Sequence, residues 1–194
     1  MFKKIFFLIL LNIFLLNKAI GSTQYEIIAS VNNKPITKLD LQDEIEIIKI
    51  INQKKIITTE DAKIALNNLI EEKIKKQEID NANLDIDKKI VNDLYNSFLK
   101  NIKIKNNDIK KKYLILIKNK IKIDRLWKQI IIQKYSWKIY INLDEINEKL
   151  SKQKNNITED LKEKMILNEK NKKYEVFSKF HLKNLKKQSL IKYF

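Results

Sequence analysis

The side chains that most often perform chemistry in proteins are scarce in this chain. It has one histidine, His181, no cysteine, and one glycine, Gly21, near the N-terminus. A metal site or a catalytic set needs several partners, so a lone histidine at the flank of a helix is expected to be structural. Without cysteine there is neither a disulfide nor a thiol nucleophile. The sequence therefore offers no catalytic residue and no metal ligand.

The position of the one glycine excludes further classes of site. Phosphate-binding loops and dinucleotide-binding fingerprints need glycine for tight turns and for close approach of the backbone to the ligand. The nucleophile elbow of the hydrolase folds needs it as well. None of these motifs can be formed by the residues that follow Gly21. We therefore expect a protein without enzymatic activity and without a cofactor.

The N-terminal residues are typical of an export signal. Lys3 and Lys4 precede an apolar run over residues 5–16, and residues 19–21 have small side chains at their first and third positions. This layout predicts a signal peptide over residues 1–21 that is cleaved before Ser22. The apolar run is shorter than the about 20 residues of a membrane span. The alternative is an uncleaved anchor, and after cleavage we expect no stable membrane span.

Lysine supplies nearly all of the positive charge. The formal net charge is +16, from 40 lysine and arginine residues against 24 acidic ones, and Arg125 is the only arginine. Arginine binds phosphates and recognises bases through bidentate hydrogen bonds. Because the chain has a single arginine, we expect no specific binding of nucleic acid. The lysines alternate with acidic and apolar residues, which favours a solvated surface. A secreted basic protein that binds anionic surfaces remains an alternative.

The pattern of apolar residues predicts helices, with short strands at the two ends. A branched stretch over residues 27–31 indicates a strand, followed by a turn and a brief second strand at residues 36–37. The branched and aromatic residues of 190–194 suit a further strand, whose obvious partner is the strand at 27–31. Residues 135–141 are also expected to be extended.

Polar residues at the expected helix starts mark the boundaries. Residues 151–156 form the most polar stretch and the best candidate for a linker. The predicted helices begin at, or span, these positions: a capping box at Thr37 and Asp40, a cap at Thr58, a cap at Asp85, a short helix over 108–118, a helix with apolar residues over 123–131, a start at Asn142, and a last helix from Thr158 to about Gln188.

Five segments together resemble the SurA family of periplasmic chaperones. The opening IASVNNKPITKLDL at 28–41 is similar to the strand, turn and capped helix that follow the signal peptide in that family. The other segments are ALNNLIEEKI at 65–74, LDID at 84–87, KIYINLDEI at 138–146 and the final helix with LIKYF at 190–194. Each motif is common alone, and their order behind a signal peptide carries the resemblance.

The resemblance implies a mainly α fold with three parts. Residues 22–150 would be the N-terminal helical module, and residues 158–194 a C-terminal helix and strand that pack back on it in a small sheet. Residues 151–157 would be a polar linker at the place where SurA chaperones carry parvulin-type isomerase domains. This interval has no room for such a domain, so no prolyl-isomerase activity is expected even where the family label suggests it.

The function that the resemblance implies is that of an ATP-independent holdase in the periplasm of a Gram-negative bacterium. Its partners would be unfolded outer-membrane or exported polypeptides. Such binding needs exposed apolar and aromatic side chains, although an aromatic residue at helical spacing more often belongs to the core. The candidate client-binding residues are Tyr95, Phe98, Tyr113, Trp127 and Trp137. A non-catalytic scaffold of the envelope with one fixed partner is the alternative.

Overall fold

The computed structural model describes residues 25–53, 58–103, 109–151 and 158–194, with the side chain of Lys149 excepted. The strands are β1 (Ile27–Val31), β2 (Lys34–Thr37) and β3 (Ile191–Tyr193). The helices are α2 (Lys38–Asn52), α3 (Thr59–Asn81), α4 (Lys88–Asn101), α5 (Lys111–Ile139), α6 (Leu143–Ser151) and α7 (Glu159–Gln188). The predicted class, mainly helical with a small sheet, is confirmed.

The sheet joins the two ends of the described chain. Its strand order is β2-β1-β3, and both pairings are antiparallel. Val31 lies opposite Ile191 and Ala29 opposite Tyr193. Beyond the strands, the amide of Asn32 donates to the carbonyl of Leu190 at 2.9 Å. The predicted pairing of the N-terminal and C-terminal strands is therefore confirmed.

Two asparagine residues, Asn32 and Asn33, form the turn between β1 and β2. Asn32 and Asn33 have φ values of 48° and 66°, in the left-handed region that asparagine tolerates better than most residues. Pro35 was expected in this turn but lies within β2, opposite Ser30. A proline is tolerated there because β2 is an edge strand and its missing amide breaks no ladder.

Most of the predicted helix starts are confirmed. Thr37 with Asp40 and Thr58 with Asp61 form complete capping boxes at the starts of α2 and α3, and Thr158 caps α7. The start of α4 was predicted wrongly. Asp87 caps that helix by accepting from the amide of Lys89, whereas Asp85 accepts from the amide of its neighbour Ile86. Asn142 lies just before α6 and accepts from the amide of Asp144.

Helix α5 is longer than the sequence suggested. Residues 111–139 are helical with a kink at Tyr135. The predicted break between helices over 108–118 and 123–131 is therefore wrong, and so is an extended 135–139. The apolar side continues through Trp127, Ile131, Tyr135 and Ile139, four residues apart, and packs against α7. Tertiary packing thus outweighs the preference of branched and aromatic residues for strands. Only Tyr135 departs from helical geometry, with φ −123° and ψ 19°.

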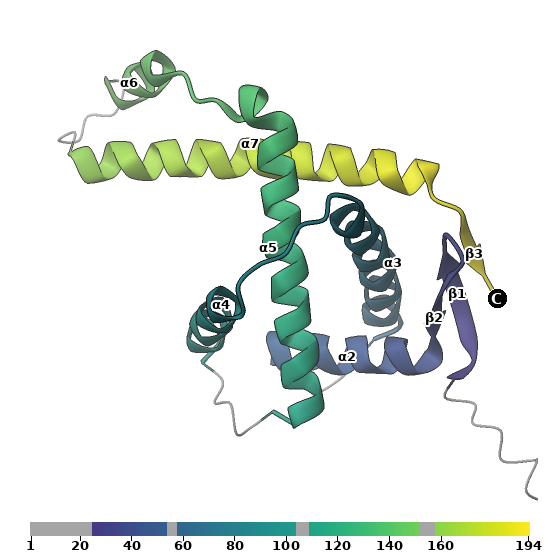
Figure 1. Cartoon of the computed structure of the whole chain (residues 1–194). Coiled ribbons are helices and arrows are strands. Elements are labelled where there is room, and N and C mark those ends of the chain that lie inside the picture. The colour runs from purple at the N-terminus through teal and green to yellow at the C-terminus, as the bar shows by residue number, and fades with distance from the viewer. Residues whose placement is uncertain (1–24, 54–57, 104–108, 152–157) are drawn as a thin grey trace, which may run out of the picture.

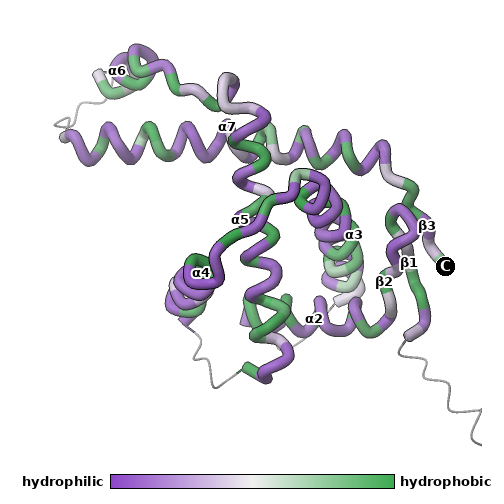
Figure 2. The backbone as a smooth tube through the Cα atoms, in the orientation of Figure 1, coloured by the Kyte–Doolittle hydropathy of each residue, from purple (hydrophilic) through white to green (hydrophobic). Residues whose placement is uncertain are grey.

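Helix α7 crosses α5 and connects the parts of the molecule (Figure 1). Helix α3 lies beside α5, the sheet lies at the C-terminal end of α7, and α6 packs on the N-terminal half of α7. Apolar residues gather where these helices face one another (Figure 2). One core cluster surrounds Trp127 at the α5–α7 crossing, and another joins the sheet to α3. The crossing is therefore a fixed junction of the fold.

No helix within the described ranges combines the length and the apolar character needed to cross a bilayer. The predicted signal peptide, residues 1–21, and residues 152–157 of the predicted linker lie outside the described residues.

Candidate binding surface

His181 lies in a polar chain that joins three helices. Its Nδ1 is 3.1 Å from the hydroxyl of Tyr135 on α5, and its Nε2 is 3.3 Å from Glu78 Oε1 on α3. A carboxylate only accepts, so Nε2 donates to Glu78 and Nδ1 accepts from Tyr135. The imidazole also stacks on Trp127 at 5.4 Å. The sequence did not indicate this chain, because its members are 46 and 103 residues apart.

The surroundings keep His181 neutral. Burial and the charge of Lys134 lower the pKa of the imidazole below its ordinary 6.5 and outweigh the opposing effect of Glu78. Burial would raise the pKa of the Glu78 carboxyl, but its contacts with Lys134 and His181 bring that pKa below 4.5. His181 lines none of three hollows in the described residues, of about 460, 360 and 750 Å³. Its contacts hold α3, α5 and α7 together, which indicates a structural role.

A second polar group is a buried ion pair between α2 and α5. Glu44 is 4 % exposed, and the Nζ of Lys120 lies 2.7 Å from its Oε2. Asn68 donates to the other oxygen of Glu44 at 3.2 Å, and Lys120 also pairs with Glu72. Burial lowers the pKa of Lys120, but Glu72 and Glu44 more than offset this and raise it. One ammonium group thus holds two carboxylates from α2 and α3 against α5, which indicates a structural role.

Two hollows, of about 460 and 360 Å³, flank this ion pair. Both are lined by Ile47 and Ile123 together with the charged groups. In the described part of the chain, no group of three or more acidic or histidine side chains could hold a metal ion.

The crossing of α5 and α7 carries five aromatic side chains that we call the aromatic patch. The ring of Tyr135 stacks on Phe177 at 5.2 Å and meets the edge of Phe180 at 6.5 Å. The Nζ of Lys138 lies 4.6 Å from the centre of the Trp137 ring and 5.6 Å from that of Phe177, so it connects the two. The patch comprises Tyr135, Trp137, Tyr140, Phe177 and Phe180.

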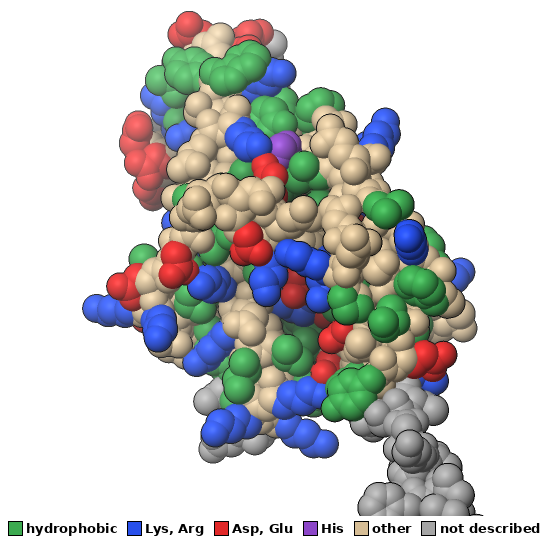
Figure 3. Space-filling model, turned by 45° about the vertical axis from the view of Figure 1, so that its right-hand side comes forward, with side chains coloured by type: hydrophobic (Ala, Val, Ile, Leu, Met, Phe, Trp, Pro, Cys, Tyr) green, Lys and Arg blue, Asp and Glu red, His purple; other side chains and the backbone are tan. Residues whose placement is uncertain are grey.

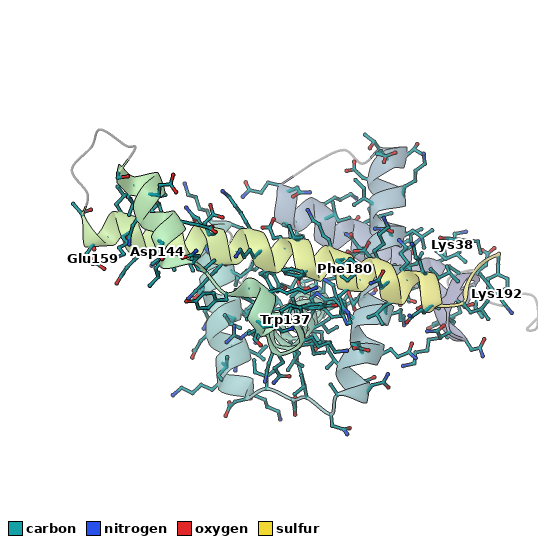
Figure 4. All side chains as sticks on the ribbon, turned by 90° about the horizontal axis from the view of Figure 1, so that it is seen from above. Lys38, Trp137, Asp144, Glu159, Phe180 and Lys192 are labelled. Atoms are coloured by element: carbon teal, nitrogen blue, oxygen red, sulfur yellow. The ribbon has the colours of Figure 1, made fainter. Side chains whose placement is uncertain are left out.

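The patch is open to solvent although its base is fixed. Trp137 is 72 %, Tyr140 71 % and Phe180 52 % exposed. Lys173 on α7 donates to the carbonyl of Tyr140 at 2.6 Å and so ties the end of α5 to α7. Figure 4 shows Trp137 and Phe180 at this crossing, where α7 is not covered by α6. Rigid aromatic groups exposed together are typical of surfaces that bind other polypeptides.

Of the five side chains predicted to bind clients, the structure leaves one fully accessible. Trp127 is 1 % exposed and Tyr95 is buried, so both are core residues in this conformation. Phe98 and Tyr113 are half-buried in the cluster between α4 and α5, and Tyr113 also lines a hollow of about 750 Å³ beside α2. Only Trp137 lies in the aromatic patch, where the structure adds Tyr140 and Phe180.

No family model matches the chain, and no curated protein matches it either.

Proposed function

We propose that the protein is an ATP-independent holdase that binds unfolded outer-membrane or exported polypeptides in the periplasm of a Gram-negative bacterium. The observation that carries this proposal is the aromatic patch, exposed on the fixed crossing of α5 and α7. A surface of this kind binds the apolar side chains of an unfolded chain and needs no nucleotide. The predicted export signal over residues 1–21 supports the compartment.

The order of the elements supports a relationship to the SurA chaperones. The resemblance implied that the C-terminal helix and strand pack back on the N-terminal module, and β3 does pair with β1. Six residues separate the end of α6 at Ser151 from Thr158, which caps α7. An isomerase domain of roughly a hundred residues, a usual domain size, does not fit in that interval. We therefore propose a holdase without isomerase activity.

The test is suppression of aggregation. The protein without its predicted signal peptide is mixed with an unfolded outer-membrane β-barrel protein at near-equal molar amounts, and light scattering is followed with and without ATP. The proposal expects clear protection that ATP does not change. A complete lack of protection across several unfolded clients would contradict it and favour the alternative, a scaffold with one fixed partner.

Two matched variants locate the binding surface. W137S with F180S removes two exposed aromatic side chains from the patch. I90S with I115S removes two apolar side chains, 46 % and 53 % exposed, from α4 and the N-terminal part of α5. Ile115 lies about 30 Å along α5 from the patch, at 1.5 Å per residue. The first variant should lose most of the protection and the second should keep it, whereas equal protection by both would exclude the patch as the site.

A further inference from the structure

The outer side of α7 carries a row of exposed side chains that is mostly cationic. The spacings of four, three, one, three and four residues place its members on one side of the helix. All of them are exposed. We call this row the lysine stripe, and it comprises Lys172, Val176, Lys179, Phe180, Lys183 and Lys187. Because Phe180 belongs to both, the stripe is continuous with the aromatic patch.

The charge of the stripe is poorly balanced by acids. Lys172 pairs with Glu169 at 3.5 Å. Lys179, Lys183 and Lys187 make no ion pair within the described part of the chain. The same holds for other exposed lysines, such as those of α4, so the feature particular to these three is their place beside Phe180. On the face drawn in Figure 3, lysines and acidic side chains are mixed. Three lysines without an ion pair in the described residues thus lie on the same side of α7 as the exposed Phe180.

The position of α6 indicates what shape of partner can reach the stripe. Leu161 and Met165 continue the stripe towards the start of α7, and there they pack against α6. By this spacing, α6 stands on the same side of α7 as the stripe. Figures 1 and 4 show α6 beside the N-terminal half of α7. The first turn of α6 carries Asp144 and Glu145, both exposed. Helix α6 and its carboxylates thus stand beside the stripe, which disfavours a flat anionic membrane and leaves room for a single chain alongside α6.

We propose that the preferred clients are acidic unfolded polypeptides, an inference that rests on the proposed function. The aromatic patch binds their apolar side chains, and Lys179, Lys183 and Lys187 bind the aspartate and glutamate residues next to these. From Lys172 to Lys187 the stripe is about 22 Å long at 1.5 Å per residue. An extended segment of roughly seven residues spans that length.

The lysines give a preference for acidic clients and speed their association, whereas the aromatic patch gives most of the binding affinity. Each exposed ion pair changes an equilibrium by about 1.5-fold to fivefold, so three together give about tenfold. Exposed charges are also screened by salt, with a Debye length of about 10 Å at 0.1 M. The preference for acidic clients should therefore fade as salt is added, while binding through the aromatic patch should persist.

The test compares two unfolded peptides with the same apolar residues, one with glutamate and one with glutamine at the polar positions. Their dissociation constants are measured by fluorescence anisotropy. K179Q with K183Q and K187Q removes the three free charges of the stripe. K88Q with K89Q and K100Q removes three exposed charges from α4 and serves as the matched control. The first variant should weaken binding of the glutamate peptide about tenfold and leave the glutamine peptide unchanged, and the control should change neither by more than about twofold.

Each other outcome overturns a defined claim. Equal weakening by both variants would mean that only the overall charge matters, and the stripe would not be the site. Binding of vesicles of anionic phospholipid that depends on the stripe, without any preference for the glutamate peptide, would assign the stripe to a lipid surface instead. Equal affinity of the wild-type protein for both peptides would refute the acidic preference alone, whereas failure to bind either would refute the proposed function too.

Discussion

The side chain of Asn32 connects the β1–β2 turn to the residues just before β3, and we predict that these contacts stabilise the fold. Its amide nitrogen donates to Gln77 Oε1 on α3 at 2.8 Å and approaches Ser189 Oγ at 3.4 Å. Its oxygen accepts from the amide of Leu190 at 2.8 Å, just before β3. One side chain in the β1–β2 turn thus contacts both α3 and the junction between α7 and β3.

Replacing Asn32 by glycine removes these contacts and keeps the backbone. Glycine adopts the φ of 48° freely, so the turn itself is preserved. The two bonds of 2.8 Å contribute about 1 kcal/mol each and the one of 3.4 Å little, so we expect a loss of about 2 kcal/mol. That is roughly thirtyfold in the folding equilibrium, and about 1 M in the urea midpoint if the slope is about 2 kcal/mol/M.

The matched control is N33G. Asn33 also has a positive φ, of 66°, but its side chain is exposed and makes no hydrogen bond to the described residues. Both variants change the unfolded chain in the same way, so the difference between them reports the side-chain contacts of Asn32. Unfolding in urea is followed by circular dichroism. If N32G and N33G unfold at the same urea concentration, Asn32 does not join the two ends.

Four further predictions follow from the same contacts. Removing residues 158–194 uncovers the apolar sides of α3 and α5, so the truncated chain should unfold at a clearly lower urea concentration than the full one; equal midpoints would contradict this. K120M should cost about 3 kcal/mol because it leaves Glu44 buried without its partner, and adding E44Q should recover much of the loss. The lowered pKa of His181 means that the unfolded chain binds more protons, so stability should fall from pH 7.5 to 5.5; H181Q should show a smaller fall, and an equal one would contradict the assignment. The protein should not accelerate isomerisation of a proline peptide, an uncatalysed process of tens to hundreds of seconds, and an acceleration that rises with protein concentration would refute this.

Local polar signals made several parts of the fold predictable. The caps at Thr37, Thr58 and Thr158 act within four residues, so the sequence alone contains the whole interaction. The terminal strand at 190–194 was predictable for another reason. A short branched stretch after a long helix has no local partner, and the strand at 27–31 was the available one.

The binding surface was less predictable because exposure depends on contacts between distant helices. Trp127 and Trp137 both lie on α5, and the sequence indicated both as client-binding candidates without showing which one is exposed. The packing of α7 does so, since Ser178 and His181 cover Trp127 while Trp137 stays outside. Phe180 could not be distinguished from the half-buried Phe177 on α7 for the same reason. The start of α4 was misplaced because Asp85 and Asp87 are both good caps two residues apart.

The central claim, that an unfolded client binds at the aromatic patch, is tested most directly by site-specific crosslinking. A photoreactive phenylalanine analogue replaces Trp137 or Phe180 in the patch, or Ile90 on α4 as the control. Each protein is irradiated with an unfolded outer-membrane β-barrel protein, with and without ATP. The account predicts crosslinks from positions 137 and 180 that unlabelled client competes away, little from position 90, and no effect of ATP. Equal crosslinking from all three positions, or crosslinks from position 90 alone, would contradict it.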